Sequence, residues 1–122
     1  MNSKTMTGLM NEIFAKCIET HDSGQKEYAD DTRNVFANFS RIANRLDLSQ
    51  EEVLLVYLFK HIDGITSHVK GHESQREDVR GRITDAIVYL CILWGMCDDH
   101  DVFKDQPGYF TTSPPVPNFE EK

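Results

Sequence analysis

Apolar residues recur at three- and four-residue spacing along most of this chain, a pattern that predicts α-helices and no strand. A first helix is expected to end at the turn cluster Asp22–Gly24, and a second covers about 35–46. A third should start at the capping box Ser49–Glu52 and end at Gly71, and a fourth should run from about 76 to 96. The chain is therefore predicted to be all-α, a compact bundle of about four helices.

Each predicted helix has one apolar face, which we expect to be its core side. These core residues are Leu9, Met10, Ile13, Phe14, Cys17 and Ile18 in the first helix, Val35, Phe36, Phe39, Ile42, Ala43 and Leu46 in the second, Leu54, Leu55, Leu58, Ile62, Ile65 and Val69 in the third, and Val79, Ile83, Ala86, Ile87, Leu90, Leu93, Trp94 and Cys97 in the fourth.

The last helix is apolar nearly all round in its C-terminal half, because its third face is also small or slim (Thr84, Val88, Cys91 and Gly95). A monomer this small rarely surrounds one helix, so we expect a homo-oligomer with this helix at the interface. The alternative is that the tail covers the helix with its aromatic residues, which are Phe103, Tyr109, Phe110 and Phe119.

One face of that helix is polar instead, with Asp78, Arg82, Asp85 and Tyr89 at spacings of four, three and four. Ile92 and Met96 continue the same face, so it is not simply the side turned to water. Ionisable groups leading into a buried stripe are costly unless they are paired or reserved for a ligand.

Composition narrows the function classes. The 122 residues form one domain (1–100) with an acidic, aromatic and proline-rich tail (101–122) that we expect to be extended. A net charge of −7 disfavours nucleic-acid binding. Three dispersed cysteines indicate free thiols in a reducing cytoplasm, and the longest apolar run, 86–97, is too short to cross a membrane.

Lys60 and Asp63 of the third helix should lie level with Asp78, Arg82 and Asp85 of the antiparallel fourth. Cations and carboxylates together suit a phosphorylated small molecule, with Mg²⁺ as a possible cofactor held by Asp63, Asp78 and Asp85. The alternative is that Lys60–Asp63 and Arg82–Asp85 are ordinary ion pairs within a helix.

Three further side chains are candidates for the same ligand site. Tyr28 in the connector and Tyr89 in the last helix would stack on a base or hydrogen-bond a sugar, although Tyr28 is equally suited to covering the core. Asn38 would place an amide near the same cavity, although an asparagine at an exposed helical position needs no ligand.

Several short motifs resemble a known family. They are Glu27-Tyr28-Ala29-Asp30, Asn38-Phe39, Lys60-His61-Ile62-Asp63, and Arg82-Ile83-Thr84-Asp85 with Tyr89. Together, over about 27–94, they resemble the phage and bacterial nucleotide-modification-associated domain, which is related to MazG-like all-α nucleoside triphosphate pyrophosphohydrolases. The resemblance implies an oligomeric α-helical fold, a nucleotide pocket between helices, acids that hold magnesium and, for a phage-encoded chain, the host cytoplasm.

The chain departs from that pattern at two positions. Relatives that hydrolyse triphosphates carry two acids three residues apart on each of two helices, whereas Lys60 and Arg82 stand in place of one acid each. This loss weakens a multi-metal mechanism and favours direct contacts between these cations and phosphate.

We therefore expect a phage-type protein that binds a nucleotide or a nucleotide-derived small molecule. One role consistent with this is to sequester a signal used in host defence. Lys60 and Arg82 would contact phosphates, while Asp63 and Asp85 hold Mg²⁺ or orient the cations. The alternatives are a Mg²⁺-dependent pyrophosphohydrolase and a helical protein–protein interaction module.

Overall fold

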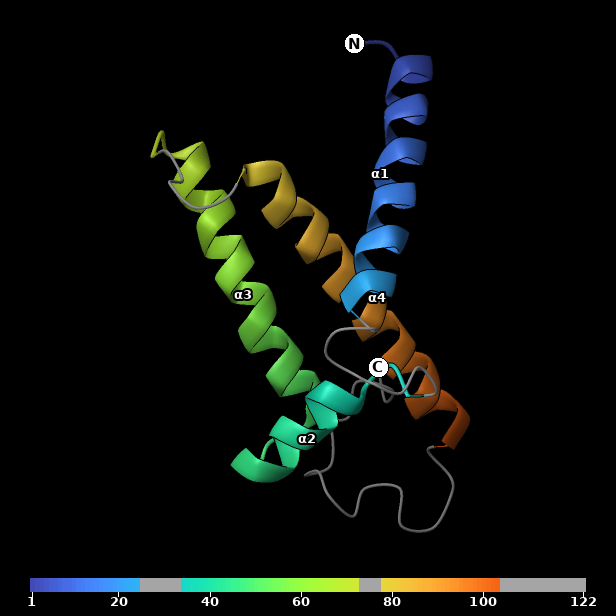
Figure 1. The fold of residues 1–122 in the computed structure, drawn as a ribbon, viewed down its shortest axis with the longest axis vertical. Coiled ribbons are helices and arrows are strands. Elements are labelled where there is room, and N and C mark those ends of the chain that lie inside the picture. The colour runs from blue at the N-terminus through green and yellow to red at the C-terminus, as the bar shows by residue number, and fades with distance from the viewer. Residues whose placement is uncertain (25–33, 73–77, 104–122) are drawn as a thin grey trace, which may run out of the picture.

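The protein is seen here in a computed structural model that describes residues 1–24, 34–72 and 78–103. Within these residues there are four α-helices and no strand: α1 (Ser3–Gly24), α2 (Ala37–Leu46), α3 (Gln50–Val69) and α4 (Val79–Phe103) (Figure 1). The prediction of an all-α bundle of four helices is confirmed. The fourth helix begins at Val79 and continues to Phe103, well past its expected end near Met96.

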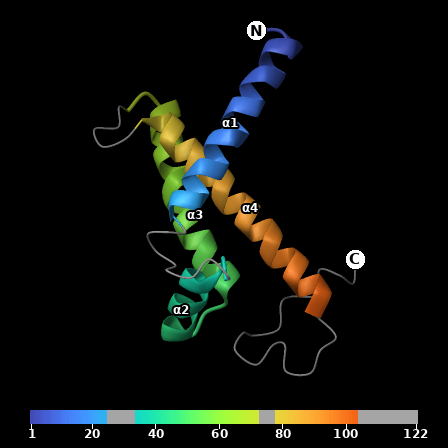
Figure 2. The ribbon, with the colours of Figure 1, turned by 45° about the vertical axis from the view of Figure 1, so that its right-hand side comes forward.

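The helices contact one another in the spatial order α2, α3, α4, α1, which differs from their order along the chain. α3 and α4 form an antiparallel pair, the short α2 packs at the start of α3, and α1 crosses α4 (Figures 1 and 2). The first turns of α1 extend beyond the other helices in both views. α4 is therefore the element that links the two ends of the fold.

The buried core lies where α2, α3 and the C-terminal half of α4 meet. Its members are Phe39, Ala43, Val53, Leu54 and Met96. Leu54 and Met96 have no exposed surface at all, so these two side chains anchor α3 and α4 to the same centre.

The turn from α2 into α3 is defined by two local features. Asp47 ends α2 in the left-handed conformation, with φ 57°, and its backbone N–H bonds to the carbonyl oxygen of Ala43. Ser49 Oγ then accepts from the Glu52 N–H at 3.1 Å, and Glu52 Oε1 accepts from the Ser49 N–H at 2.9 Å. The predicted capping box is thus confirmed, and it fixes where α3 begins.

The expected core face of α4 is confirmed at Ala86, which is buried, and at Leu93, which packs against the core, but it is wrong at four other positions. Ile83, Leu90 and Cys97 are exposed, and Trp94 retains 73% of its surface, whereas the polar face continues inward to Met96. Because α4 is apolar on several sides, its hydrophobic pattern alone does not say which side meets α3.

Other expected core residues are also exposed. Among the described helices α1 packs only on α4, and its Met10, Phe14 and Ile18 are exposed. The remaining exposed members are Val35 before α2, Leu46 at the end of α2, and Ile62 and Val69 of α3. Among the described residues, none of the helices is long and apolar enough to span a membrane.

Candidate functional site

Three residues of α3 face three residues of α4 in a continuous antiparallel register. Gly64 lies against Arg82, His61 against Asp85, and Tyr57 against Tyr89. Each step of three or four residues back along α3 is matched by an equal step forward along α4. We call these six residues the α3–α4 seam.

Gly64 leaves space at the first of these contacts, where the Arg82 side chain lies on the α3 backbone. A Cβ at this position would overlap the Cδ, Nε and Cζ atoms of Arg82. The missing side chain thus makes room for the guanidinium between the helices, where its Nε is buried. The polar stripe predicted on α4 does turn toward its neighbouring helix at this point.

The second contact pairs an imidazole with a carboxylate. His61 Nε2 lies 3.7 Å from Asp85 Oδ2, within ion-pair range for a protonated imidazole but longer than a hydrogen bond. The His61 side chain is 12% exposed and that of Asp85 is 35% exposed. The Nδ1 atom of His61 is buried and has no hydrogen-bond partner among the described residues. Asp85 is therefore the seam carboxylate that a ligand can reach.

The inner end of the seam is aromatic. Tyr57 and Tyr89 are stacked, with centroids 6.2 Å apart, and Phe39 of α2 meets both rings edge-on at 6.1 Å. The His61 ring lies 5.6 Å from the Tyr89 ring on another side. Tyr89, expected to stack on a base, is thus placed in the packing between α2, α3 and α4.

The remaining predicted site residues lie outside the seam. Lys60 and Asp63 are both exposed. Asp78 receives a hydrogen bond from the backbone N–H of Arg80 at 3.1 Å, and Asn38 Oδ1 accepts from the Arg41 guanidinium at 2.7 Å. Of the seven predicted ligand residues, Arg82, Asp85 and Tyr89 are brought together, while Tyr28 lies outside the described residues.

The acids expected to hold magnesium do not gather. Asp63, Asp78 and Asp85 are all described, and nowhere in the described ranges do three His, Cys, Asp or Glu side chains form a group able to hold a metal ion. These three acids therefore do not form a ready-made metal centre.

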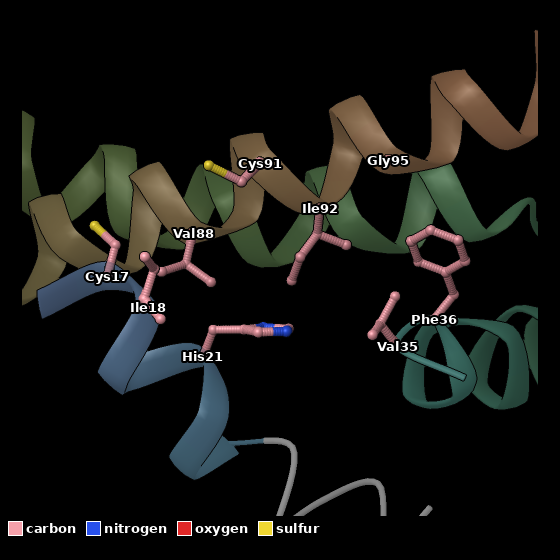
Figure 3. A pocket seen from close by; sticks show the side chains of 9 residues that line it. All are labelled: Cys17, Ile18, His21, Val35, Phe36, Val88, Cys91, Ile92 and Gly95. Carbon is pink, nitrogen blue, oxygen red and sulfur yellow. The ribbon is translucent and has the colours of Figure 1, made fainter. Parts of the chain in front are cut away.

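An apolar pocket of about 260 Å³ lies on another flank of α4 (Figure 3). Ile18 and His21 of α1 line one side, Val35 and Phe36 lie opposite, and α4 forms the wall between them. The other lining residues are Cys17, Val88, Cys91, Ile92 and Gly95. His21 projects into the opening and is the only ionisable side chain of the lining besides the two thiols.

The pocket and the seam adjoin at Cys17. Its Sγ lies 4.0 Å from the carbonyl oxygen of Thr84, the residue before Asp85. Burial raises the pKa of the Cys17 thiol, and the nearby Cys91 and Asp85 raise this pKa further. Cys17 of the pocket lining thus contacts the residue that precedes Asp85 of the seam.

Sequence reasoning missed His61, which we expected at the surface, and did not single out His21. A signal for His61 exists in the spacing of α3. Tyr57, His61 and Gly64 are four and then three residues apart, whereas Arg82, Asp85 and Tyr89 of α4 are three and then four residues apart, as an antiparallel pair requires. No comparable signal exists for His21, because the pocket is formed by residues from three separate segments.

Comparison with known proteins adds no assignment: no protein-family model matches the chain, and no curated protein or solved structure is similar to it.

Proposed function

We propose that this protein binds a nucleotide or a nucleotide-derived phosphorylated small molecule along α4. The base would enter the apolar pocket, and the phosphates would extend toward Arg82 of the α3–α4 seam and toward the exposed Lys60. The observation that carries this proposal is the junction at Cys17, where an apolar pocket meets a charged seam. Nucleotides are amphipathic in the same way, with a flat base at one end and anionic phosphates at the other.

One property of the site supports binding, and a second argues against turnover. The pocket has an apolar lining with few polar groups, as small-molecule sites do. The seam offers one cation, one accessible carboxylate and one imidazole, without the grouped acids that a two-metal phosphohydrolase uses. Binding without turnover would suit removal of a nucleotide signal from solution.

Calorimetry tests the proposal directly. The full chain is titrated with mono-, tri- and cyclic nucleotides, with and without Mg²⁺, and one class is expected to release heat. Chromatography of the recovered nucleotide should show it unchanged, whereas monophosphate and pyrophosphate would show hydrolysis instead. If no nucleotide binds under either condition, the proposal fails and the interaction-module alternative is favoured.

Two pairs of variants locate the ligand. Arg82→Gln should weaken affinity about tenfold, because a charged hydrogen bond to phosphate contributes about 1.5–3 kcal/mol. Arg45→Gln on the exposed surface of α2 is its matched control and should leave affinity unchanged. Val88→Phe should block the pocket, whereas Val56→Phe on the exposed side of α3 should not.

A further inference from the structure

The side of α4 that faces away from both α1 and α3 is apolar and open to solvent. Ile83, Ile87, Leu90 and Trp94 follow one another there at spacings of four, three and four, which keeps them on one face of the helix. Ile83, Leu90 and Trp94 are exposed, and Ile87 is half-buried. A contiguous apolar stripe of this kind on a protein surface marks an interaction site.

The two ends of this stripe carry opposite charges. Arg80 lies three residues before Ile83, and Asp98 lies four residues after Trp94, so both continue the same helical face. Both side chains are exposed. We call the six residues from Arg80 to Asp98 the outer stripe. It has a cation at one end, an anion at the other and only apolar residues between them.

Such a stripe is complementary to itself when two copies run antiparallel. Placing Arg80 of one copy beside Asp98 of a second also places Ile83 beside Trp94, and Ile87 beside Leu90. Each pairing occurs twice, because a two-fold axis makes the contact isologous. The charged pairs and the apolar pairs are offset by one residue, because Ile83 follows Arg80 by three residues whereas Asp98 follows Trp94 by four. This offset is about 1.5 Å along a stripe that is about 27 Å long at about 1.5 Å per residue, and the long Arg80 side chain can span it.

We propose that two copies of this chain form a two-fold dimer through antiparallel packing of their outer stripes. The charge pattern selects a second copy as the occupant, because the same stripe supplies both the cation and the anion. It also selects the antiparallel orientation, since parallel packing would set Arg80 against Arg80 and Asp98 against Asp98. In the single chain Arg80 lies 3.5 Å from Asp78, but both side chains are largely exposed and such a pair contributes little.

Sizing of the full chain by light scattering and native mass spectrometry tests the dimer. Trp94 is the only tryptophan, so its fluorescence emission should move to longer wavelength as dilution separates the copies. Leu90→Asp should give a folded monomer at concentrations where the unaltered chain is dimeric. Phe59→Asp on α3 and Met10→Asp on α1 replace equally exposed apolar residues and should leave the dimer intact.

Charge exchange tests the orientation without altering the apolar contact. Arg80→Asp and Asp98→Arg should each weaken the homodimer about tenfold, because each creates like-charge contacts at both ends. Mixed in equal amounts, these two variants should form a heterodimer in which both ends again pair opposite charges. The double variant should dimerise like the unaltered chain.

Three results would overturn the proposal. A monomer at 100 µM would mean that another segment or another protein covers the stripe. A dimer that survives Leu90→Asp but is lost with Phe59→Asp or Met10→Asp would place the interface elsewhere. A mixture of the two charge variants that associates no better than either alone would exclude the antiparallel register.

Discussion

The guanidinium of Arg82 lies directly on the backbone of Gly64, in space that any larger residue would occupy. This contact joins α3 to α4 at the outer end of the α3–α4 seam. The position of the Arg82 side chain on α4 therefore depends on the absence of a side chain at Gly64 on α3.

Gly64→Ala should therefore destabilise the protein although alanine favours helices. Overpacking costs about 1–3 kcal/mol, and the gain in helix propensity returns only about 1 kcal/mol. Chemical denaturation should show a net loss of up to about 2 kcal/mol in the free energy of unfolding. Gly8→Ala on α1 is the control, because no atom lies near its added Cβ, and it should be neutral or stabilising.

Adding Arg82→Ala to Gly64→Ala should relieve the overlap. We expect the double variant to lose less free energy of unfolding than the two single variants lose together. A double-mutant cycle measures this difference. Additive losses would show that Arg82 moves aside freely and that Gly64 is not required by this contact.

Met96→Ala should be among the most damaging single changes in α4. Met96 is completely buried between α2, α3 and α4, so its truncation should lower the free energy of unfolding by about 2–5 kcal/mol. Met10→Ala on the exposed side of α1 is the matched control, expected to cost less than about 1 kcal/mol. Similar losses at both positions would contradict the described core.

Loss of the capping box at Ser49 should lower the free energy of unfolding less than Met96→Ala does. Ser49→Ala removes the hydroxyl that accepts from the Glu52 N–H, and denaturation should show a loss of about 1 kcal/mol. Ser49→Asp should keep most of the stability, because aspartate also accepts this hydrogen bond. A Ser49→Ala protein as stable as the original would mean that the start of α3 is fixed by packing alone.

Cys17 should resist modification in the folded protein. Burial, Cys91 and Asp85 all raise the pKa of its thiol, so little thiolate is present near neutral pH. In a Cys91→Ser/Cys97→Ser variant, a thiol reagent should label Cys17 slowly at pH 8 and rapidly after unfolding in urea. Fast labelling of the folded variant would contradict the contact between α1 and α4.

The same raised pKa sets the sign of a pH effect. The neutral thiol is favoured in the folded state, so its contribution to stability is complete below the ordinary thiol pKa. That contribution is lost as pH rises through the raised pKa of the folded protein. Denaturation at several alkaline pH values should show a smaller loss of stability for Cys17→Ala than for the unaltered chain.

The sequence was sufficient to predict four helices, their approximate limits and the capping box at Ser49, because these depend on local spacing and capping chemistry. The orientation of α4 could not be predicted. Trp94 and Met96 are both large and apolar, and two residues apart they lie on different faces; which one is buried depends on where α3 packs.

The candidate site was also predicted only in part from the sequence. The stripe of Arg82, Asp85 and Tyr89 was predicted from spacing, and the structure places these residues at the α3–α4 seam. His61 was missed because its signal, the spacing of Tyr57, His61 and Gly64, becomes visible only when α3 is compared with α4. The pocket was missed because its walls come from segments far apart in the chain.

Among the four described helices, the first to leave the ribosome has its contacts with the last. Cys17 and Thr84 are 67 residues apart in sequence, and among the described elements α1 packs on α4 alone. During synthesis α2 and α3 can pair early, whereas α1 must wait until most of the chain has emerged. Until then the side of α1 around Cys17, which α4 covers in the folded chain, is available to chaperones, and a stop codon placed before α4 would leave α1 without its site in the fold.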